Sequence, residues 1–324
     1  MRGVRTALVM AAALGCGWAL WGQATATGTQ RGIWVARWEK DAVAASTIRR
    51  VSPPDGHFFQ SMMHPDGTKV VFWGRTLGAG RRSSDIWVTN IDGTDVHRVT
   101  KDQARNDAPF WTPDGRIVFA SRRGGEPGPR IWVMDADGSN ARQVTTGNEV
   151  VADARPCVSP DGLTVVFCSN RAGGRESKLW RVPLAGGKPE QVTKGPGSHN
   201  RPVFSHDGKR LAFFTTASPV KRFNLAVMDW PNGKIVQPVT LGPPRDNLRG
   251  PFWMRDNKRI IIHGRLNASP FVRLYLIEVA TGKWKAVNVP GAVSCGHGSL
   301  DRDEKVITFD GARNVPTKTG RNTP

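Results

Sequence analysis

The sequence predicts an all-β fold, a six-bladed β-propeller made of four-stranded antiparallel blades. A turn motif returns at intervals of 46 to 49 residues, short apolar segments surround every copy in the same order, and the two ends of the chain each supply half of one further unit. Repeats of this length with several strands apiece are typical of propeller blades. The 36 glycines and 23 prolines among 324 residues also favour a chain rich in turns.

The repeat is marked by a turn of the type Ser/Thr-Pro-Asp-Gly. Proline presets φ for the turn, aspartate can accept a hydrogen bond from the backbone ahead, and glycine takes the left-handed position. The first copy, at 64–67, begins with His. Two full copies, one copy with His in place of Pro and two degenerate copies follow it. The six copies occupy residues 64–67, 112–115, 159–162, 205–208, 254–257 and 301–304.

Each unit has the same internal order, which the second one illustrates. A short strand at 108–111 precedes the turn, and an apolar strand at 117–120 follows it. After a polar loop come Ile-Trp-Val at 131–133, an Asp-Gly hairpin, and a fourth strand at 143–145 that ends in Val-Thr. The corresponding fourth strands of other units are expected at 98–100, 191–193 and 238–240.

The chain ends complete one another. The first apolar segments, at 33–35 and 50–52, match the third and fourth strands of a unit, whereas 295–299 and 306–309 match the first and second. We therefore expect the N-terminal third and fourth strands to pair with the C-terminal first and second strands in a single blade. Closure of this kind removes the unpaired edges that terminal strands would otherwise expose.

Residues 1–26 have the features of a signal peptide. Arg2 and Arg5 precede the uncharged apolar stretch 6–22, and Ala24-Thr25-Ala26 resembles a cleavage site. A membrane anchor is the alternative, although the stretch is short for a span. We expect a periplasmic or secreted protein, not transmembrane after cleavage, with the propeller at 27–310. Residues 311–324 lack an apolar pattern and are expected to form a flexible C-terminal tail.

The formal net charge of +19 favours anionic partners. An anionic polysaccharide, lipid headgroups or an acidic protein would fit, and solubility alone is the alternative explanation. No nucleic-acid partner is expected, because the signal peptide predicts export and the sequence has no nucleic-acid-binding motif. The sequence carries no signature of oligomeric state.

Three cysteines remain beyond the signal peptide. Cys157 and Cys168 lie on two arms of one predicted hairpin, and Cys295 is isolated. An oxidising compartment permits a Cys157–Cys168 disulfide, while buried free thiols are the alternative. No Cys/His spacing resembles a zinc site, so no cofactor is expected.

The repeat resembles the TolB-type β-propeller repeat, a relative of WD-type repeats. The resemblance rests on Ser-Pro-Asp-Gly at 159–162, Phe-Cys-Ser-Asn-Arg at 167–171, Ile-Trp-Val-Met-Asp at 131–135, Asp-Gly at 137–138 and Val-Thr at 144–145. It covers about residues 32–310 and implies a periplasmic propeller that binds proteins of the cell envelope. TolB proteins also carry an N-terminal α/β domain, which is not expected here because the predicted propeller begins soon after the cleavage site.

Polar residues just before the first strands are predicted to converge on the channel mouth, since the loops between fourth and first strands share one face. Arginine forks there would suit carboxylates or phosphates, and loop fixing or solvation is the alternative role. The candidate binding residues are His57, Arg105, Asn106, Asp107, Arg155, His199, Asn200, Arg201, Arg249 and His297.

These features favour an exported TolB-like binding or scaffolding module for an envelope protein or anionic glycan. No nucleophile elbow, phosphate loop or zinc-protease motif occurs, so an enzyme is not favoured. The alternative is a metal-assisted lyase or hydrolase of an acidic polysaccharide, implied by a resemblance to oligogalacturonate lyase. His199 or His297 would then act as base or as ligand of a divalent metal, and Arg155, Arg201 and Arg249 would hold uronate carboxylates.

Overall fold

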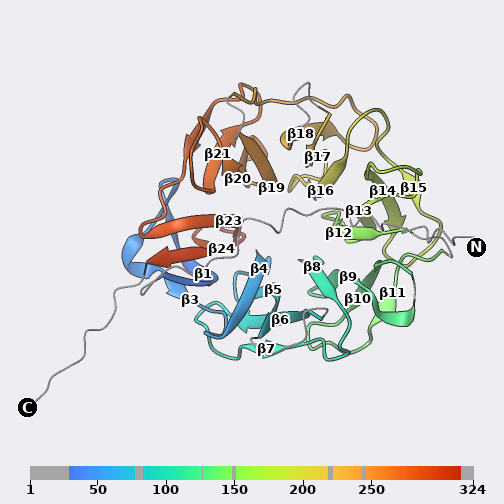
Figure 1. Ribbon diagram of the computed structural model, residues 1–324, viewed down its shortest axis with the longest axis horizontal. Helices are drawn as coiled ribbons and strands as arrows, with labels where there is room; N and C mark the ends of the chain where they lie inside the picture. The colour runs from blue at the N-terminus through green and yellow to red at the C-terminus, as the bar shows by residue number, and fades with distance from the viewer. Residues whose placement is uncertain are drawn as a thin grey trace, which may run out of the picture.

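The computed structural model describes residues 29–76, 83–125, 127–147, 151–217, 222–242 and 246–314. Within these residues six antiparallel sheets stand around a central axis, as Figure 1 shows, and there is no α-helix. The predicted six-bladed β-propeller is confirmed. The predicted signal peptide at 1–26 and the tail residues 315–324 lie outside the described residues.

The blades follow one another along the chain, each beginning with its innermost strand. Blade 1 contains β4 (Gly56–Met63), β5 (Lys69–Thr76), β6 (Asp85–Asn90) and β7 (His97–Arg98); blade 2 contains β8 (Asn106–Trp111), β9 (Ile117–Ser121), β10 (Arg130–Met134) and β11 (Arg142–Gln143). Blade 3 contains β12 (Asp153–Val158), β13 (Thr164–Ser169), β14 (Lys178–Pro183) and β15 (Glu190–Gln191). Blade 4 contains β16 (His199–Phe204), β17 (Arg210–Thr215) and β18 (Asn224–Asp229). Blade 5 contains β19 (Asn247–Trp253), β20 (Arg259–Arg265), β21 (Arg273–Glu278) and β22 (Trp284–Ala286).

Blade 6 joins the two ends of the described chain. Its strands are β23 (Ala292–Leu300), β24 (Val306–Asn314), β1 (Thr29–Glu39) and β3 (Arg49–Arg50), while β2 (Ala42–Val43) folds back on β1. The antiparallel pairing of β1 with β24 runs from Thr29↔Asn314 to Arg37↔Val306, which confirms the predicted closure. β24 thus extends beyond the boundary predicted at residue 310. Short 3₁₀ turns occur at Ala45–Thr47 and Arg123–Gly125.

The outermost strands are shorter than predicted. β7, β11 and β15 are two residues long, and in blade 4 the segment predicted at 238–240 is replaced by a single bridge between Val227 and Val236. Pro238 has no N–H to extend that ladder. The recurrent Val-Thr nevertheless has a clear role, because the Thr145 hydroxyl accepts the Ile131 N–H at 3.0 Å and Thr193 accepts that of Leu179 at 2.9 Å.

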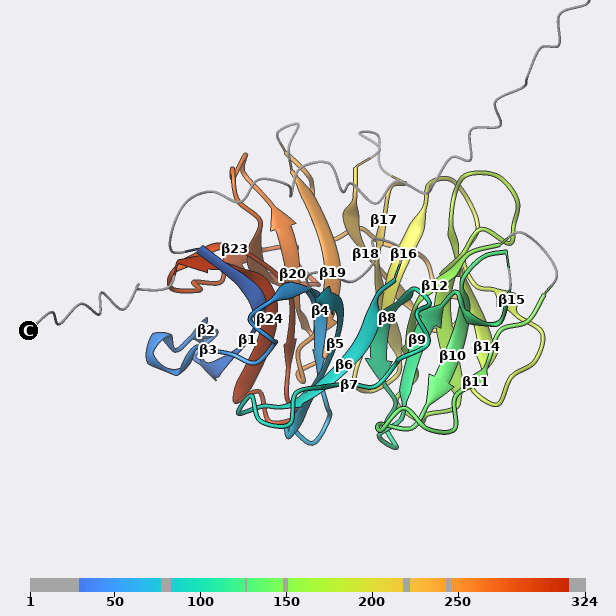
Figure 2. The ribbon, with the colours of Figure 1, turned by 60° about the horizontal axis from the view of Figure 1, so that its bottom comes forward.

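The hydrophobic core lies between adjacent blades, and each interface is filled by the apolar middle strands. Figure 1 shows the inner strands β4, β8, β12 and β16 facing the centre of the ring, and Figure 2 shows the same blades tilted by 60°. Cys157, Cys168 and Cys295 are buried free thiols. Cys157 stands opposite Val166 and Cys168 opposite Ala154, so the two are not cross-strand partners. No helix in the described residues could span a membrane.

Candidate functional site: a ring of left-handed bulges in the channel

Each innermost strand is interrupted by a β-bulge at the same place. The pairing of the first and second strands shifts register there in all six blades, and one bulge residue per blade has φ between 45° and 61°. We call these six residues the bulge ring. In blade order they are Gln60, Ala108, Arg155, Arg201, Gly250 and His297. Bulges of this kind re-aim side chains and are frequent beside functional sites.

The bulge ring surrounds a cavity of about 80 Å³ in the channel. Every blade contributes to its wall, and the residues that follow the ring are mostly proline, with Phe110 and Phe252 beyond them. Phe110 packs against the cores of three blade interfaces. The cavity wall therefore combines prolines and aromatic side chains with the basic residues Arg155, Arg201 and His297, the arrangement expected of a pocket for a small polar group.

The His297 ring contacts a carboxylate with one nitrogen and a guanidinium with the other. Its Nδ1 lies 2.7 Å from Asp310 Oδ2, and its Nε2 lies 2.7 Å from Arg201 Nη1. A guanidinium only donates hydrogen bonds, so Nε2 must accept from Arg201 and the ring proton must sit on Nδ1, from which it is donated to Asp310. Asp310 Oδ2 also accepts the Gln60 backbone N–H at 2.7 Å. The imidazole is therefore neutral, with one defined tautomer.

Electrostatics agree with this protonation state. Burial and the nearby Arg201 lower the pKa of His297, although Asp310 opposes them. The His297 backbone N–H points at His263 Nδ1 at 3.3 Å, and the two rings are 4.2 Å apart. Burial, followed by the charges of neighbouring groups, holds the pKa of His263 well below its usual value.

Gly250 makes room for these two histidines. Its φ is +61°, and a Cβ added there would lie 2.7 Å from His263 Cε1 and 3.2 Å from His297 Cδ2. Any other residue at this ring position would displace the imidazoles. Glycine in blade 5 is therefore what allows Arg201 of blade 4 to reach His297 of blade 6.

The other arginines and Asn200 are placed differently. Arg155 lines the cavity and its Nη1 donates to Asn200 Oδ1 at 3.1 Å, while Asn200 Nδ2 donates to the Ser177 hydroxyl at 2.7 Å. Arg249 precedes the ring residue of its blade, and its guanidinium lies 4.7 Å from the centre of the Phe223 ring. Arg249 is not part of the cavity wall.

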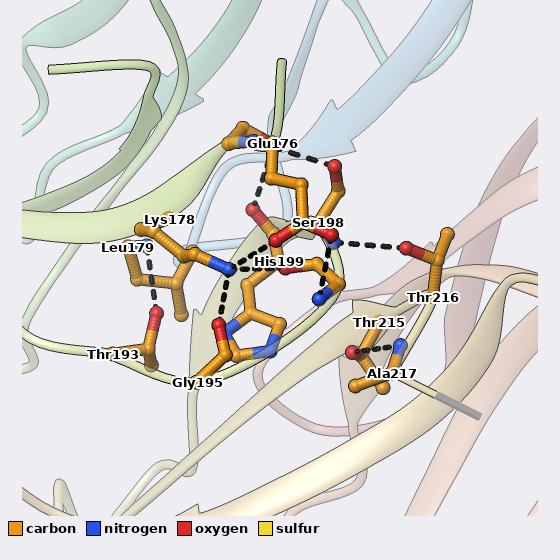
Figure 3. Close-up of polar contacts among 12 residues, drawn as sticks. Glu176, Lys178, Leu179, Thr193, Gly195, Ser198, His199, Thr215, Thr216 and Ala217 are labelled. Carbon is orange, nitrogen blue, oxygen red and sulfur yellow. Dashed lines mark hydrogen bonds and ion pairs between the residues drawn. The ribbon is translucent and has the colours of Figure 1, made fainter. Parts of the chain in front are cut away.

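His199 is buried within blade 4 and does not line the cavity. Its ring packs against Phe213, and its Nδ1 is buried without a hydrogen-bond partner. Figure 3 shows the adjacent Lys178, whose ammonium donates to Glu176 and to the carbonyls of Gly195 and Gly197. Burial, and then the charge of Lys178, lower the pKa of His199 to about 4. This cluster fixes the loop before β16.

The remaining candidates lie at the rim or inside blades. His57 is exposed at the start of β4, where burial and the charges of Arg75 and Arg31 lower its pKa. Arg105 forms an exposed ion pair with Asp107 at 3.1 Å. Asn106 is fully buried and accepts the Ser121 hydroxyl at 2.7 Å. These contacts fix the chain locally and do not reach the cavity.

Most candidates thus lie inside the first strands instead of the loops before them, and three of the ten meet at the cavity: Arg155, Arg201 and His297. His57 and His199 lie elsewhere.

Sequence analysis missed Gln60, Gly250 and Asp310. A proline directly after the bulge residue, at 109, 156, 202 and 251, is the signal that marks four bulges, because proline inside a strand favours a bulge. Among the described residues, no three His, Cys, Asp or Glu side chains form a metal-binding group.

Comparisons with known proteins agree with this architecture. Residues 39–176 match the family model of the TolB β-propeller domain. An uncharacterized protein of Agrobacterium fabrum is 36% identical over 106 residues, 32% of this chain and 33% of that protein, so the match spans about a third of the relative.

Solved structures resemble nearly the whole chain. A putative TolB from Agrobacterium tumefaciens has a TM-score of 0.66 at 14% identity, covering 90% of this chain and 100% of that one. Oligogalacturonate lyase in complex with manganese has a TM-score of 0.57 at 12% identity, covering 89% and 98%. Identities this low show the fold alone. The chain is therefore a six-bladed β-propeller, and its residues 39–176 match the TolB β-propeller domain.

Proposed function

We propose that this protein is an exported binding module whose channel mouth holds a carboxylate of an acidic envelope protein or an anionic glycan. The observation that carries the proposal is the position of Arg155 and Arg201, which the bulge ring places beside one cavity. Arg155 is the bulge-ring residue of blade 3, and Arg201 is the bulge-ring residue of the neighbouring blade 4. Their forks are therefore suited to approach a single carboxylate or two adjacent ones.

The contacts of both arginines support an anionic ligand. Arg155 donates to an amide oxygen and Arg201 to a neutral imidazole. A charge-assisted bond to a carboxylate is about twice as strong as a bond between neutral groups, so an incoming carboxylate competes well for these donors. The apolar walls of the cavity strengthen such a bond by excluding water, and the net charge of +19 attracts anions from a distance.

Binding of two carboxylate polymers tests the proposal. Poly-L-glutamate represents an acidic protein, polygalacturonate an anionic glycan, and uncharged dextran is the negative control. We expect Arg155→Gln combined with Arg201→Gln to weaken binding at least about tenfold, since each charged hydrogen bond contributes about 1.5–3 kcal/mol. Arg142→Gln combined with Arg302→Gln removes the same charge from exposed positions outside the cavity.

The two variants separate the channel from the general charge of the surface. Equal weakening in both would show that net charge alone attracts the polymer, and would contradict the proposed site. Absence of binding by the wild-type protein to either polymer at low salt would contradict the proposed function itself.

A lyase acting on an acidic polysaccharide is the second candidate, and one observation favours it. The Asp310–His297 pair orients a neutral imidazole whose Nε2 faces Arg201 at the cavity. An oriented base beside a carboxylate-binding arginine is what abstraction of a proton next to a uronate carboxylate requires. The fold likeness to oligogalacturonate lyase supports the same possibility. Incubation with polygalacturonate and Mn²⁺, monitored by absorbance of the unsaturated product, tests it; a trace as flat as that of His297→Gln would remove this candidate.

A further inference from the structure

We propose that carboxylate binding at Arg201 is coupled to the uptake of one proton by His297, so that the channel site binds more tightly as the pH falls. This inference rests on the proposed binding function and concerns the regulation of that same site.

The coupling follows from competition for one lone pair. His297 Nδ1 is committed to Asp310 as a donor, which leaves Nε2 with a single lone pair. That lone pair now accepts from Arg201 Nη1 at 2.7 Å. Nε2 can accept from the guanidinium or carry a proton, and it cannot do both. The position of Arg201 and the protonation of His297 therefore exclude each other.

A carboxylate changes this balance in three ways. It takes the Arg201 donor, it adds negative charge next to the imidazole, and it offers its second oxygen as an acceptor for a protonated Nε2. The step consumes one proton from solvent, which forms the Nε2–H bond, and no covalent bond breaks. In the complex the carboxylate would bridge Arg201 and the imidazolium, whose other N–H still bonds to Asp310.

The charges around His297 come from five strands. Asp310 on β24 favours its protonation, whereas Arg201 on β16 and Arg155 on β12 oppose it. His263 on β20 also faces the ring, and Arg249 on β19 acts on His263. Two arginines are thus the main charges that keep His297 neutral, and a bound carboxylate neutralises both. Burial and the charges of His297, Arg201 and Arg249 lower the pKa of His263, and no carboxylate opposes them. His297, which contacts Asp310, is therefore the residue that gains the proton.

The direction of the pH dependence follows. Binding raises the pKa of His297 from the low value of the empty site. The additional affinity is complete at a pH below the pKa of the empty site, and it is lost as the pH rises through the higher pKa of the complex. Between the pKa of the complex and the pKa of the empty site, the affinity rises at most about tenfold for each unit by which the pH falls.

Calorimetry measures the proton directly. N-acetyl-triglutamate is a suitable probe because its carboxyl groups, with pKa values of about 4.3, remain ionised above pH 6. Its binding enthalpy is measured at one pH in two buffers that have different heats of ionisation and contain neither phosphate nor carboxylate. The dependence of the enthalpy on the buffer heat gives the number of protons taken up. We expect up to about one proton for the wild-type protein at some pH between about 6 and 8, the range in which histidine commonly titrates.

His297→Gln is the decisive variant, and His97→Gln is its control. Glutamine is compatible with the ring position, since Gln60 occupies it in blade 1 with φ 56°. His97 is partly exposed on the outer strand β7, far from the bulge ring in the blade. We expect proton uptake to disappear in His297→Gln and to persist in His97→Gln. His297→Asn serves as a second variant, because Asn tolerates a left-handed backbone.

The outcomes separate this inference from the proposed function. Binding without proton uptake by the wild-type protein across that pH range would overturn the coupling alone, as would uptake that persists in both His297 variants. A wild-type protein that fails to bind the probe would overturn the proposed function, and the coupling with it.

Discussion

Trp34 of β1 stands directly opposite Phe309 of β24, so residues from the two ends of the described chain are cross-strand neighbours in blade 6. Both side chains are buried in the same hydrophobic cluster. The Trp34 indole N–H also donates to the Gly311 carbonyl at 3.3 Å, and the Arg313 guanidinium lies 5.0 Å from the indole ring. Trp34 thus joins the two ends of the chain through packing, a hydrogen bond and a cation–π contact.

Truncation of Trp34 should weaken this closure. We expect Trp34→Ala to lower the free energy of unfolding by about 3–5 kcal/mol, the usual cost of removing a buried tryptophan. Trp284→Ala is the matched control, because Trp284 is 36% exposed on the outer strand β22, and its loss should cost much less. Urea unfolding monitored by circular dichroism measures both. Equal losses would show that the β1–β24 seam contributes nothing special.

The buried ion pair of blade 3 gives a second prediction. Arg171 donates to both carboxylate oxygens of Asp153, at 3.0 and 2.5 Å, and the Asp153 side chain is completely buried. Arg171→Met leaves that carboxylate without its counter-ion, so we expect a loss of about 3–5 kcal/mol in unfolding free energy. Arg181→Met breaks the exposed pair with Glu190 and should cost about 0–1 kcal/mol. A small effect of Arg171→Met would mean that water reaches Asp153.

His199 should make the fold sensitive to acid. Burial lowers its pKa to about 4 in the folded protein, against an ordinary value of 6.5. The unfolded chain therefore binds the proton first, so the stability is complete above about pH 6.5 and is lost as the pH falls toward 4. The loss is on the order of 3 kcal/mol.

Replacement of His199 isolates this contribution. Asn106 occupies the equivalent position of blade 2, which makes His199→Asn the natural variant. We expect its unfolding free energy to change less between pH 7 and about pH 4 than that of the wild-type protein or of the partly exposed control His97→Asn. An unchanged slope in His199→Asn would show that other groups dominate acid unfolding, His263 and His297 among them, because their pKa values are also lowered.

Gly250 should be intolerant of alanine for a reason beyond its backbone. The added Cβ would press on His263 and His297, so Gly250→Ala should disturb the His297–Arg201 contact and weaken carboxylate binding. Gly174→Ala is the control, because Gly174 also has a positive φ of 80° but has open space around it. Both variants carry the cost of a left-handed alanine, about 1 kcal/mol. Binding of poly-L-glutamate and unfolding in urea separate the two effects, and equal behaviour of the variants would contradict the steric argument.

The blade count and the closure were predictable because local chemistry fixes them. Each Pro-Asp-Gly turn has its own mechanism: at Gly115, for example, φ is +82° and the N–H donates to the Thr112 carbonyl. Counting half-units at the ends then required no knowledge of distant contacts. The loops between fourth and first strands lie on one face of the ring because every blade has the same strand order. The polar residues near these loops could therefore be predicted to lie close to the channel.

The composition of the site was less predictable because it depends on one backbone angle per blade and on contacts between blades. Arg155, Arg201 and His297 reach the cavity through left-handed bulges inside the first strands, and the repeat pattern does not predict these bulges. Asp310 lies on a second strand and acquires its role only where β24 meets β23. Arg105 and Arg249 have similar positions in the sequence, yet they pair with Asp107 and with Phe223.

The prolines that follow four of the bulges limit how the channel can be used. The innermost strands contain these residues, Pro109, Pro156, Pro202 and Pro251. One edge of each innermost strand pairs with the second strand of its blade, and the other edge borders the cavity. Lacking an N–H, these residues interrupt the row of main-chain donors that an added strand would need. A partner therefore cannot enter by extending a sheet, and whatever the channel accepts must be selected by the shape and charge of its side chains.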